Sequence, residues 1–251
     1  MLFRSVLFQV AVYTNFLVQA LLFSPVLLLP ERMVWPVARF WVRSTLWLHG
    51  VILGTRDEIR GRENIPSGGF IVASKHQSAW ETLRLVELFH RPTFILKREL
   101  LWVPLFGWYL QRTGMIPVDR GKRSTALAAM TARARQAMRE GRQIIIFPEG
   151  TRRPPGAPPA YRFGVTRLYS ELQAPCLPVA LNSGLFWPRR SLAQRRGTIL
   201  LRCLEAIPPG VEPSVFSARI QATIESAVAG LIDESVARQP ELLENLQTNP
   251  A

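Results

Sequence analysis

A long segment without a charged residue, from Ser5 to Pro30, is the feature of this sequence that most restricts its fold. About 20 helical residues cross the hydrocarbon core of a bilayer, so the segment is long enough to span one. Polar side chains interrupt it at Gln9, Asn15 and Gln19, and Pro25 is expected to kink or end a helix. The segment predicts a membrane-associated helix, with a buried core helix as the plainer alternative.

A second apolar segment, Met33 to Leu53, follows and is rich in tryptophan, phenylalanine, valine and leucine. It carries Arg39 and Arg43, and its tryptophans are amphipathic side chains suited to the headgroup level of a membrane. Together the two segments predict a hydrophobic two-helix membrane arm over residues 1–53, which either spans the bilayer or lies in one leaflet. A cleaved signal peptide is disfavoured because no A-x-A-like cleavage site follows the apolar run.

The charge of the chain narrows the class of partner. Lysine and arginine number 31 against 18 aspartates and glutamates, a formal net charge of +13. Such a surface attracts anionic lipid headgroups, phosphorylated ligands or nucleic acid. Arginines are dense after Pro30, whereas only Arg4 precedes it, which favours a body on the cytoplasmic side of a membrane.

Beyond residue 54, short apolar runs alternate with helical patterns. The runs that predict strands are 69–74, 92–96, 114–120, 143–147, 177–182 and 198–204. The segments that predict helices are 82–89, 124–140, 165–172 and 216–236. Alternating strands and helices predict an α/β fold with a central mixed sheet flanked by helices. We assign residues 54–238 to this domain and 239–251 to a polar C-terminal tail.

His76 is the candidate for acid–base chemistry, because it stands between a predicted strand and a predicted helix, with Glu81 five residues on. No zinc pattern, G-x-S-x-G or phosphate-binding glycine loop occurs in the sequence. A histidine can take the proton of an alcohol, and a carboxylate on its other ring nitrogen fixes the tautomer. The alternatives are a structural histidine and a helix-capping glutamate, since Ser78-Ala-Trp-Glu81 also fits a capping box.

The segment Phe-Pro-Glu-Gly-Thr-Arg at 147–152 directly follows the strongest predicted strand. Backbone amides of Gly150 and Thr151 are candidates for binding a phosphate or a developing oxyanion. Arg152 is a candidate for clamping a phosphate in bidentate fashion. The alternative is a tight turn that carries a solvated arginine.

Four segments now stand in order along the chain: KHQSAWE (75–81), GMIPVDR (114–120), FPEGTR (147–152) and CLPVAL (176–181). They resemble the four motif blocks of the glycerolipid acyltransferases, the 1-acyl-sn-glycerol-3-phosphate acyltransferase family. The resemblance covers about residues 76–181, and the hydrophobic arm before it also fits. The family's usual H-x4-D is H-x4-E here, so Glu81 keeps the carboxylate with one extra methylene.

The resemblance implies direct acyl transfer from acyl-CoA or acyl-carrier protein to the hydroxyl of a lysophospholipid, without a covalent enzyme intermediate. It implies that His76 is the general base, with Glu81 as its partner. The residues expected around the phosphate of the acceptor are Lys97, Arg120, Glu149, Gly150, Thr151 and Arg152. No metal is expected, and no cofactor beyond the acyl thioester as co-substrate.

The interpretation we favour is therefore a membrane-associated enzyme that acylates lysophosphatidic acid to phosphatidic acid in phospholipid biosynthesis. We expect it at a bacterial inner membrane with its catalytic domain on the cytoplasmic side. Another lysolipid such as lyso-ornithine lipid is the nearest alternative acceptor, and a basic membrane-binding protein without activity is the non-enzymatic alternative. Nucleic acid is not expected, because no recognised RNA or DNA module occurs, and nothing indicates the oligomeric state.

Overall fold

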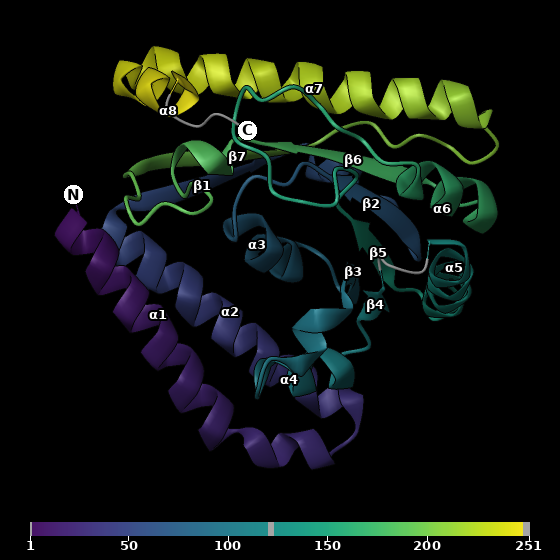
Figure 1. Ribbon diagram of the computed structural model, residues 1–251, viewed down its shortest axis with the longest axis horizontal. Coiled ribbons are helices and arrows are strands. Elements are labelled where there is room, and N and C mark those ends of the chain that lie inside the picture. Colours follow the sequence, from purple (N-terminus) through teal and green to yellow (C-terminus); the bar gives the residue numbers. More distant parts are fainter. Residues whose placement is uncertain (1, 120–122, 248–251) are drawn as a thin grey trace.

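In the computed structural model, which describes residues 2–119 and 123–247, a seven-stranded sheet lies at the centre of the molecule (Figure 1). The strand order is β1-β7-β6-β2-β5-β3-β4. Among these neighbours only β6 and β7 are antiparallel, so the predicted mixed sheet is confirmed. The strands are β1 (Thr55–Arg60), β2 (Phe70–Ser74), β3 (Pro92–Lys97), β4 (Ile116–Val118), β5 (Gln143–Ile146), β6 (Cys176–Leu181) and β7 (Gly197–Cys203).

Helices cover both faces of the sheet. Figure 1 shows the long helix α7 on one face and α3 on the other, with α5 beside the β4 end. The helices of the body are α3 (Trp80–Leu88), α4 (Phe106–Arg112), α5 (Arg123–Arg139), α6 (Gly164–Leu172), α7 (Pro213–Arg238) and α8 (Leu243–Gln247). The α/β class predicted from the sequence is thus confirmed.

The complete burial of the three central strands explains why they could be predicted from the sequence. Every residue of β2, β5 and β6 is buried, as expected for strands that are covered on both faces and therefore read as continuous apolar runs. Their parallel register pairs Ala73 with both Ile146 and Pro178. Residues that follow β2, β5 and β6 in the chain consequently meet at one edge of the sheet, where parallel α/β sheets place their ligands.

Strand β1 is one that the sequence did not predict. Its sequence, TRDEIR, has four charged side chains among six residues and shows no apolar run. It lies at the edge of the sheet, paired on one side with β7. Charged side chains are common on edge strands because they hinder pairing with another chain, so the position of β1 accounts for its composition.

The predicted arm is a hairpin of α1 (Leu2–Leu22) and α2 (Glu31–Leu53), joined by a short 3-10 helix, Ser24–Leu28. Side-chain hydrogen bonds connect the two helices, with Asn15 Nδ2 2.9 Å from Ser44 Oγ. Asn15 and Gln19, two of the polar residues that interrupt the first apolar segment, therefore serve as contacts between the helices. Gly54, at a φ of 73°, ends α2 in the left-handed conformation that glycine adopts without steric cost.

Much of the arm's outer surface is apolar and exposed. Among the described residues, α1 is the one helix long and apolar enough to cross a membrane, by length and composition alone. Exposed apolar side chains of α1 include Phe3, Val6, Val10, Leu17, Val18 and Leu21. The segment that precedes α4, together with α4 itself, adds Leu100, Trp102, Val103 and Trp108. Tyr109 of α4 donates to the carbonyl of Ala20 at 3.3 Å, so the two apolar surfaces adjoin.

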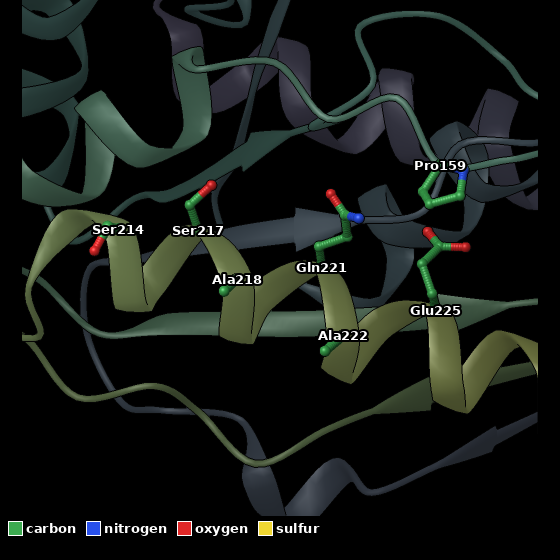
Figure 2. Close-up of a pocket in the computed structure, with 7 residues that line it drawn as sticks. All are labelled: Pro159, Ser214, Ser217, Ala218, Gln221, Ala222 and Glu225. Carbon is green, nitrogen blue, oxygen red and sulfur yellow. The ribbon is translucent and has the colours of Figure 1, made fainter.

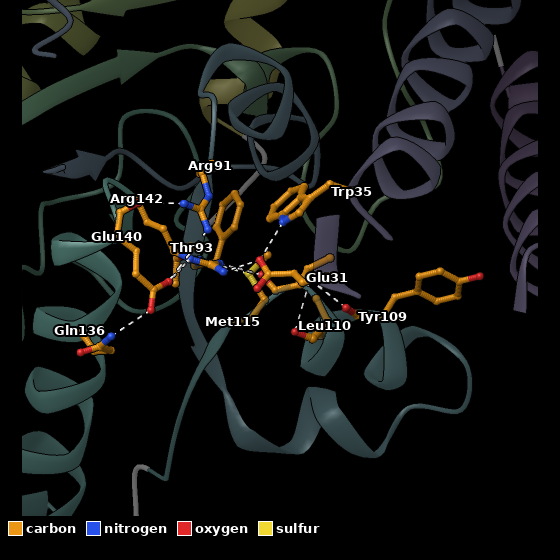
Figure 3. A network of polar contacts seen from close by, with 12 residues as sticks. Glu31, Trp35, Arg91, Thr93, Tyr109, Leu110, Met115, Gln136, Glu140 and Arg142 are labelled. Carbon is orange, nitrogen blue, oxygen red and sulfur yellow. Dashed lines mark hydrogen bonds and ion pairs between the residues drawn. The ribbon is translucent and has the colours of Figure 1, made fainter. Parts of the chain in front are cut away.

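A buried arginine fastens the start of α2 to the body (Figure 3). Arg142 is 4% exposed and pairs with Glu31, which also accepts a hydrogen bond from Trp35 at 3.0 Å. The guanidinium of Arg142 also donates to the carbonyl of Thr113 at 3.1 Å and contacts the carboxylate of Glu140 at 3.2 Å. Removing Glu31 would leave the buried charge of Arg142 without its partner on the arm, and a buried charge that loses a partner is costly.

Candidate active site

His76 lies two residues after the end of β2 and is oriented by Glu81 in the first turn of α3. Its Nδ1 lies 2.8 Å from Glu81 Oε1. An ionised carboxylate only accepts hydrogen bonds, so Nδ1 carries the proton and donates it. Nε2 is then left as the acceptor of the neutral ring, which is the state that a general base requires.

The Glu81 carboxylate is buried and satisfied on both oxygens. Oε1 also accepts from the backbone amides of Gln77 and Ser78, each at 2.7 Å, and Oε2 accepts from Ser183 Oγ at 2.7 Å. The contact with the Ser78 amide is half of a capping box, and Ser78 Oγ in turn accepts from the amide of Trp80. The two alternatives drawn from the sequence, capping and orientation of the imidazole, thus coexist on one oxygen.

The 147–152 turn packs directly on the His76 ring. Phe147 stacks on the imidazole with ring centroids 3.8 Å apart and an interplanar angle of 15°. The amide of Arg153 donates to the carbonyl of His76 at 2.8 Å. Two segments about 70 residues apart in the chain are therefore in contact at the edge predicted from the parallel strands.

One expectation about this turn needs correction. The amide of Gly150 donates to the carbonyl of Phe147 at 2.8 Å, with Gly150 at a φ of 66°. It closes the turn and is not available to an anion in this conformation. The amide of Thr151 has no backbone acceptor in the described part of the chain, so it is the amide of this pair that can meet a ligand.

Behind the turn lies a buried ionic cluster that sequence reasoning missed. Lys75, 2% exposed, contacts Glu149 at 3.0 Å and Glu225 of α7 at 2.7 Å. Tyr161 donates to the same Glu225 oxygen at 2.9 Å. Burial raises the pKa of Glu149 above its ordinary value, while the charge of Lys75 opposes that rise. The Glu149 side chain is therefore held inside the protein by a lysine, whereas the sequence led us to expect it at the phosphate pocket.

The cationic residues predicted from the sequence differ in their exposure and position. Arg152 is half-buried in the turn beside His76. Lys97 is exposed at the end of β3, where the register with β5 carries it to the same edge of the sheet. Arg120 lies outside the described residues. Ser183, whose contact with Glu81 was not predicted, stands directly after the fourth motif block and Asn182.

A cavity of about 550 Å³ opens on the α7 side of this region (Figure 2). In the close-up, Gln221 and Glu225 lie near Pro159, and small α7 side chains line the remainder. His76 is not among the lining residues. Glu225 connects the cavity to Lys75, so the cavity reaches the back of the ionic cluster and not the imidazole.

In the part of the chain that the structure describes, no group of three or more histidine, cysteine, aspartate or glutamate side chains is placed to hold a metal. Cys176 and Cys203 are free and buried, and burial raises the pKa of the Cys203 thiol to about 12. Such thiols stay protonated and are not nucleophiles at neutral pH. The chemistry available at this edge is thus acid–base chemistry at His76, beside positive charge.

Comparison with known proteins identifies the family of the chain. The acyltransferase family model matches residues 56–182. The 1-acyl-sn-glycerol-3-phosphate acyltransferase of Pseudomonas aeruginosa is 36% identical over 201 residues, which cover 80% of this chain and 77% of that protein. The alpha form of the same enzyme from Mus musculus is 30% identical over 207 residues, covering 80% of this chain and 71% of that protein.

A solved structure shares the fold. The crystal structure of the 1-acyl-sn-glycerophosphate acyltransferase from Thermotoga maritima has a TM-score of 0.76 with this structure, at 22% sequence identity. The match covers 92% of this chain and 98% of that one. From the family match, the sequence relatives and the shared fold, we conclude that this chain is an O-acyltransferase that belongs to the 1-acyl-sn-glycerol-3-phosphate acyltransferase family.

Proposed function

We propose that the protein transfers an acyl chain from an acyl thioester to the free hydroxyl of a lysophosphatidic acid, which gives phosphatidic acid for phospholipid biosynthesis. The observation that carries the proposal is the 2.8 Å hydrogen bond from His76 Nδ1 to Glu81, with the 147–152 turn stacked on the same ring. A base for the hydroxyl and a cationic site for the phosphate then stand side by side. The names of the relatives support the same acceptor.

In the proposed reaction, the acceptor hydroxyl donates a hydrogen bond to Nε2 of His76. As its oxygen attacks the thioester carbonyl carbon, the proton passes to Nε2, and Glu81 stabilises the imidazolium that forms. The C–S bond then breaks, and the imidazolium returns the proton to the departing thiolate. The products are an ester and a free thiol, and acyl-CoA and acyl-carrier protein both supply the required C–S bond.

Positive charge at the same edge favours a phosphate-bearing acceptor. Arg152 is half-buried beside the turn, and Lys97 is exposed at the end of the neighbouring β3. We include Arg120 from the family resemblance. A lyso-ornithine lipid has no phosphate and offers these cations a single carboxylate charge, whereas the phosphate monoester of lysophosphatidic acid carries more negative charge and a third oxygen, which is why lysophosphatidic acid is the acceptor we propose.

We further propose that the arm lies in one leaflet of the membrane, with the body on the cytoplasmic side. Arg43 of α2 pairs with Glu87 of α3 at 3.0 Å, so α2 is docked on the body and is not surrounded by lipid. Phe8 of α1 packs edge-on against Trp187 at 5.1 Å, which supports a retained helix over a cleaved signal. The exposed apolar face of α1 remains for the acyl-chain region.

Product analysis with a panel of lysolipids and one labelled acyl thioester tests the proposal. We expect labelled phosphatidic acid as the main product, with turnover at least about 100-fold lower in His76→Ala. His90→Ala is the matched control, because His90 is exposed between α3 and β3, and we expect it to retain wild-type turnover. Turnover of lyso-ornithine lipid but not of lysophosphatidic acid would refute the acceptor, and an active His76→Ala would refute the base.

A further inference from the structure

The segment between β6 and β7, residues 183–196, which we call the 183–196 loop, contacts the catalytic pair and the motif turn. Ser183 donates to Glu81 at 2.7 Å, and the amide of Gly184 donates to Gln77 Oε1 at 3.0 Å. A Cβ at Gly184 would lie only 2.9 Å from carbon atoms of both Gln77 and Pro155. The close packing shows that this loop has a fixed position against both motif segments.

Further along, the loop brings two more arginines to the motif turn. Arg189 donates from Nη1 to the backbone carbonyl of Arg152 at 2.9 Å, and Arg190 follows it in the chain. Burial lowers the pKa of Arg189, and the nearby charges of Arg190 and Arg152 lower it further. The charges of Arg190 and Arg152 thus both act unfavourably on the guanidinium of Arg189, which is held at the motif turn by its hydrogen bond to the Arg152 carbonyl.

In the described part of the chain, no carboxylate forms an ion pair with any of these three arginines. By contrast, Arg153 beside the turn and Arg195 later in the loop pair with Glu149 and Glu244. Like charges held together without a counterion cost free energy that an anionic ligand would recover. Guanidinium groups suit phosphate in particular, because two parallel N–H donors match two of its oxygens.

We propose that Arg189 and Arg152 together bind a phosphate monoester of a substrate, with Arg190 adding longer-range attraction. The inference rests on the proposed function and adds a phosphate-binding residue from outside the four motif blocks. Two substrates carry such a group: the lysophosphatidic acid acceptor and, when the donor is acyl-CoA, its 3′-phosphate.

The location of the loop favours the acceptor as the source. The backbone amide of Gln194 donates to Ser5 Oγ of α1 at 3.0 Å, and Trp187 packs against Phe8 of the same helix. The loop thus joins the arm to the site. A lipid whose acyl chain stays beside the arm would carry its phosphate to this loop and its hydroxyl toward His76.

Steady-state kinetics of Arg189→Gln in the full-length protein tests the inference. We expect KM for lysophosphatidic acid to rise about 10- to 100-fold, with kcat and the KM for acyl-CoA changed less than about threefold. Arg189→Lys keeps the charge but not the paired donors, so its KM for lysophosphatidic acid should lie between the values of wild type and Arg189→Gln. Arg133→Gln, an exposed arginine on α5, is the matched control and should behave as wild type.

The two phosphate sources separate in one further comparison. If the ligand is the donor's 3′-phosphate, Arg189→Gln raises the KM for acyl-CoA and has no effect with a 3′-dephospho-CoA thioester. An unchanged KM for both substrates, or an equal rise in Arg133→Gln, would overturn the inference.

Thermal unfolding with glycerol 3-phosphate gives a readout that does not need turnover. Ligand that binds the folded state raises the unfolding temperature, and we expect this protection in wild type and its loss in Arg189→Gln. Protection without acyl transfer by wild type would refute the proposed function and leave the phosphate site standing. Equal protection of both proteins would contradict the site itself.

Discussion

A single oxygen of Glu81 accepts from the amides that lead into helix α3 and from the imidazole that we propose as the base, so a substitution must be chosen to separate the two roles. Glu81→Gln keeps an oxygen for the amides of Gln77 and Ser78 but loses the negative charge. We expect kcat to fall about 10²- to 10⁴-fold, because the imidazolium loses its partner. Circular dichroism and acyl transfer measured on the same preparation check this.

Ser183→Ala is the graded control for that substitution. It removes one hydrogen bond to Glu81 Oε2 and leaves the carboxylate charged, so we expect roughly a tenfold fall in kcat. A Glu81→Gln protein that is unstable yet as active per folded molecule as wild type would show that capping is the residue's only role.

The buried cluster behind the turn makes a stability prediction at the residue scale. Lys75→Met leaves the buried Glu149 with only the more distant Arg153, at 3.9 Å, and we expect the free energy of unfolding to fall by about 3–5 kcal/mol. Adding Glu149→Gln to Lys75→Met should recover part of the loss, because the amide needs no counterion. Denaturant unfolding of the single and double variants measures both values. A single variant as stable as wild type would contradict the prediction.

The sequence identified residues whose chemistry shows locally and missed those defined by distant contacts. His76 and Glu81 are five residues apart at a strand end, a spacing that can be read directly. Lys75 meets Glu225 across 150 positions, and nothing in either neighbourhood announces the pair. Gly150 was assigned to anion binding from its residue type, whereas its amide closes the turn.

At the scale of elements, strands covered on both faces were predictable and the charged edge strand was not. The runs at β2, β5 and β6 are apolar throughout because helices cover both faces of the sheet. Strand β1 has one neighbour and carries charge, so its sequence resembles a loop. The two-helix arm was recognisable from its length and hydrophobicity, but its docking on the body through Arg142 was not.

The contact between α1, α2 and the 183–196 loop should respond to acid. Burial lowers the pKa of His49 from 6.5 to about 4, and its ring stacks on Trp187 at 4.9 Å. Between pH 6.5 and 4 the unfolded chain binds a proton at His49 that the folded protein excludes. His49 therefore contributes stability above pH 6.5 that is lost as pH falls toward 4, by about 3 kcal/mol in all.

Urea unfolding at pH 7, 5.5 and 4.5 tests this, with His49→Phe as the comparison. The variant keeps an aromatic ring against Trp187 but has no proton to bind, so its stability should depend less steeply on pH. In this variant Thr55, whose hydroxyl contacts His49 Nδ1, keeps its hydrogen bond to the backbone carbonyl of residue 49. Identical pH slopes in both proteins would rule out His49 as the cause.

For the whole molecule, the arm and the body form one unit, in which the exposed apolar face of α1 and the edge that carries His76 are joined. Arg142 fixes the start of α2, and Gln194 and Trp187 of the 183–196 loop hold the start of α1. Deleting residues 1–53 would therefore expose apolar surface of the body and leave the buried Arg142 without its partner Glu31. Such a truncation should aggregate, so membrane attachment is better tested with substitutions on the exposed face.

Phe3, Val10 and Leu17 form one exposed stripe along α1, spaced by seven residues and 79%, 59% and 51% exposed. If this stripe lies among acyl chains, replacing all three with glutamate removes apolar area from the membrane and introduces charge there. We expect vesicle affinity in a sedimentation assay to fall at least about 100-fold. Turnover of a short-chain lysophosphatidic acid in detergent should persist, because none of the three contacts the catalytic edge.

The matched control places the same three charges on the opposite layer. Val215, Ser226 and Ala229 are exposed on α7, across the sheet from the arm (Figure 1). Glutamate at all three should leave vesicle binding unchanged, since that face is directed away from the lipid. Equal loss in both triple variants would mean that net positive charge, and not the apolar stripe, holds the protein on the membrane. Undiminished binding of the α1 variant would show that the arm does not enter the acyl-chain region.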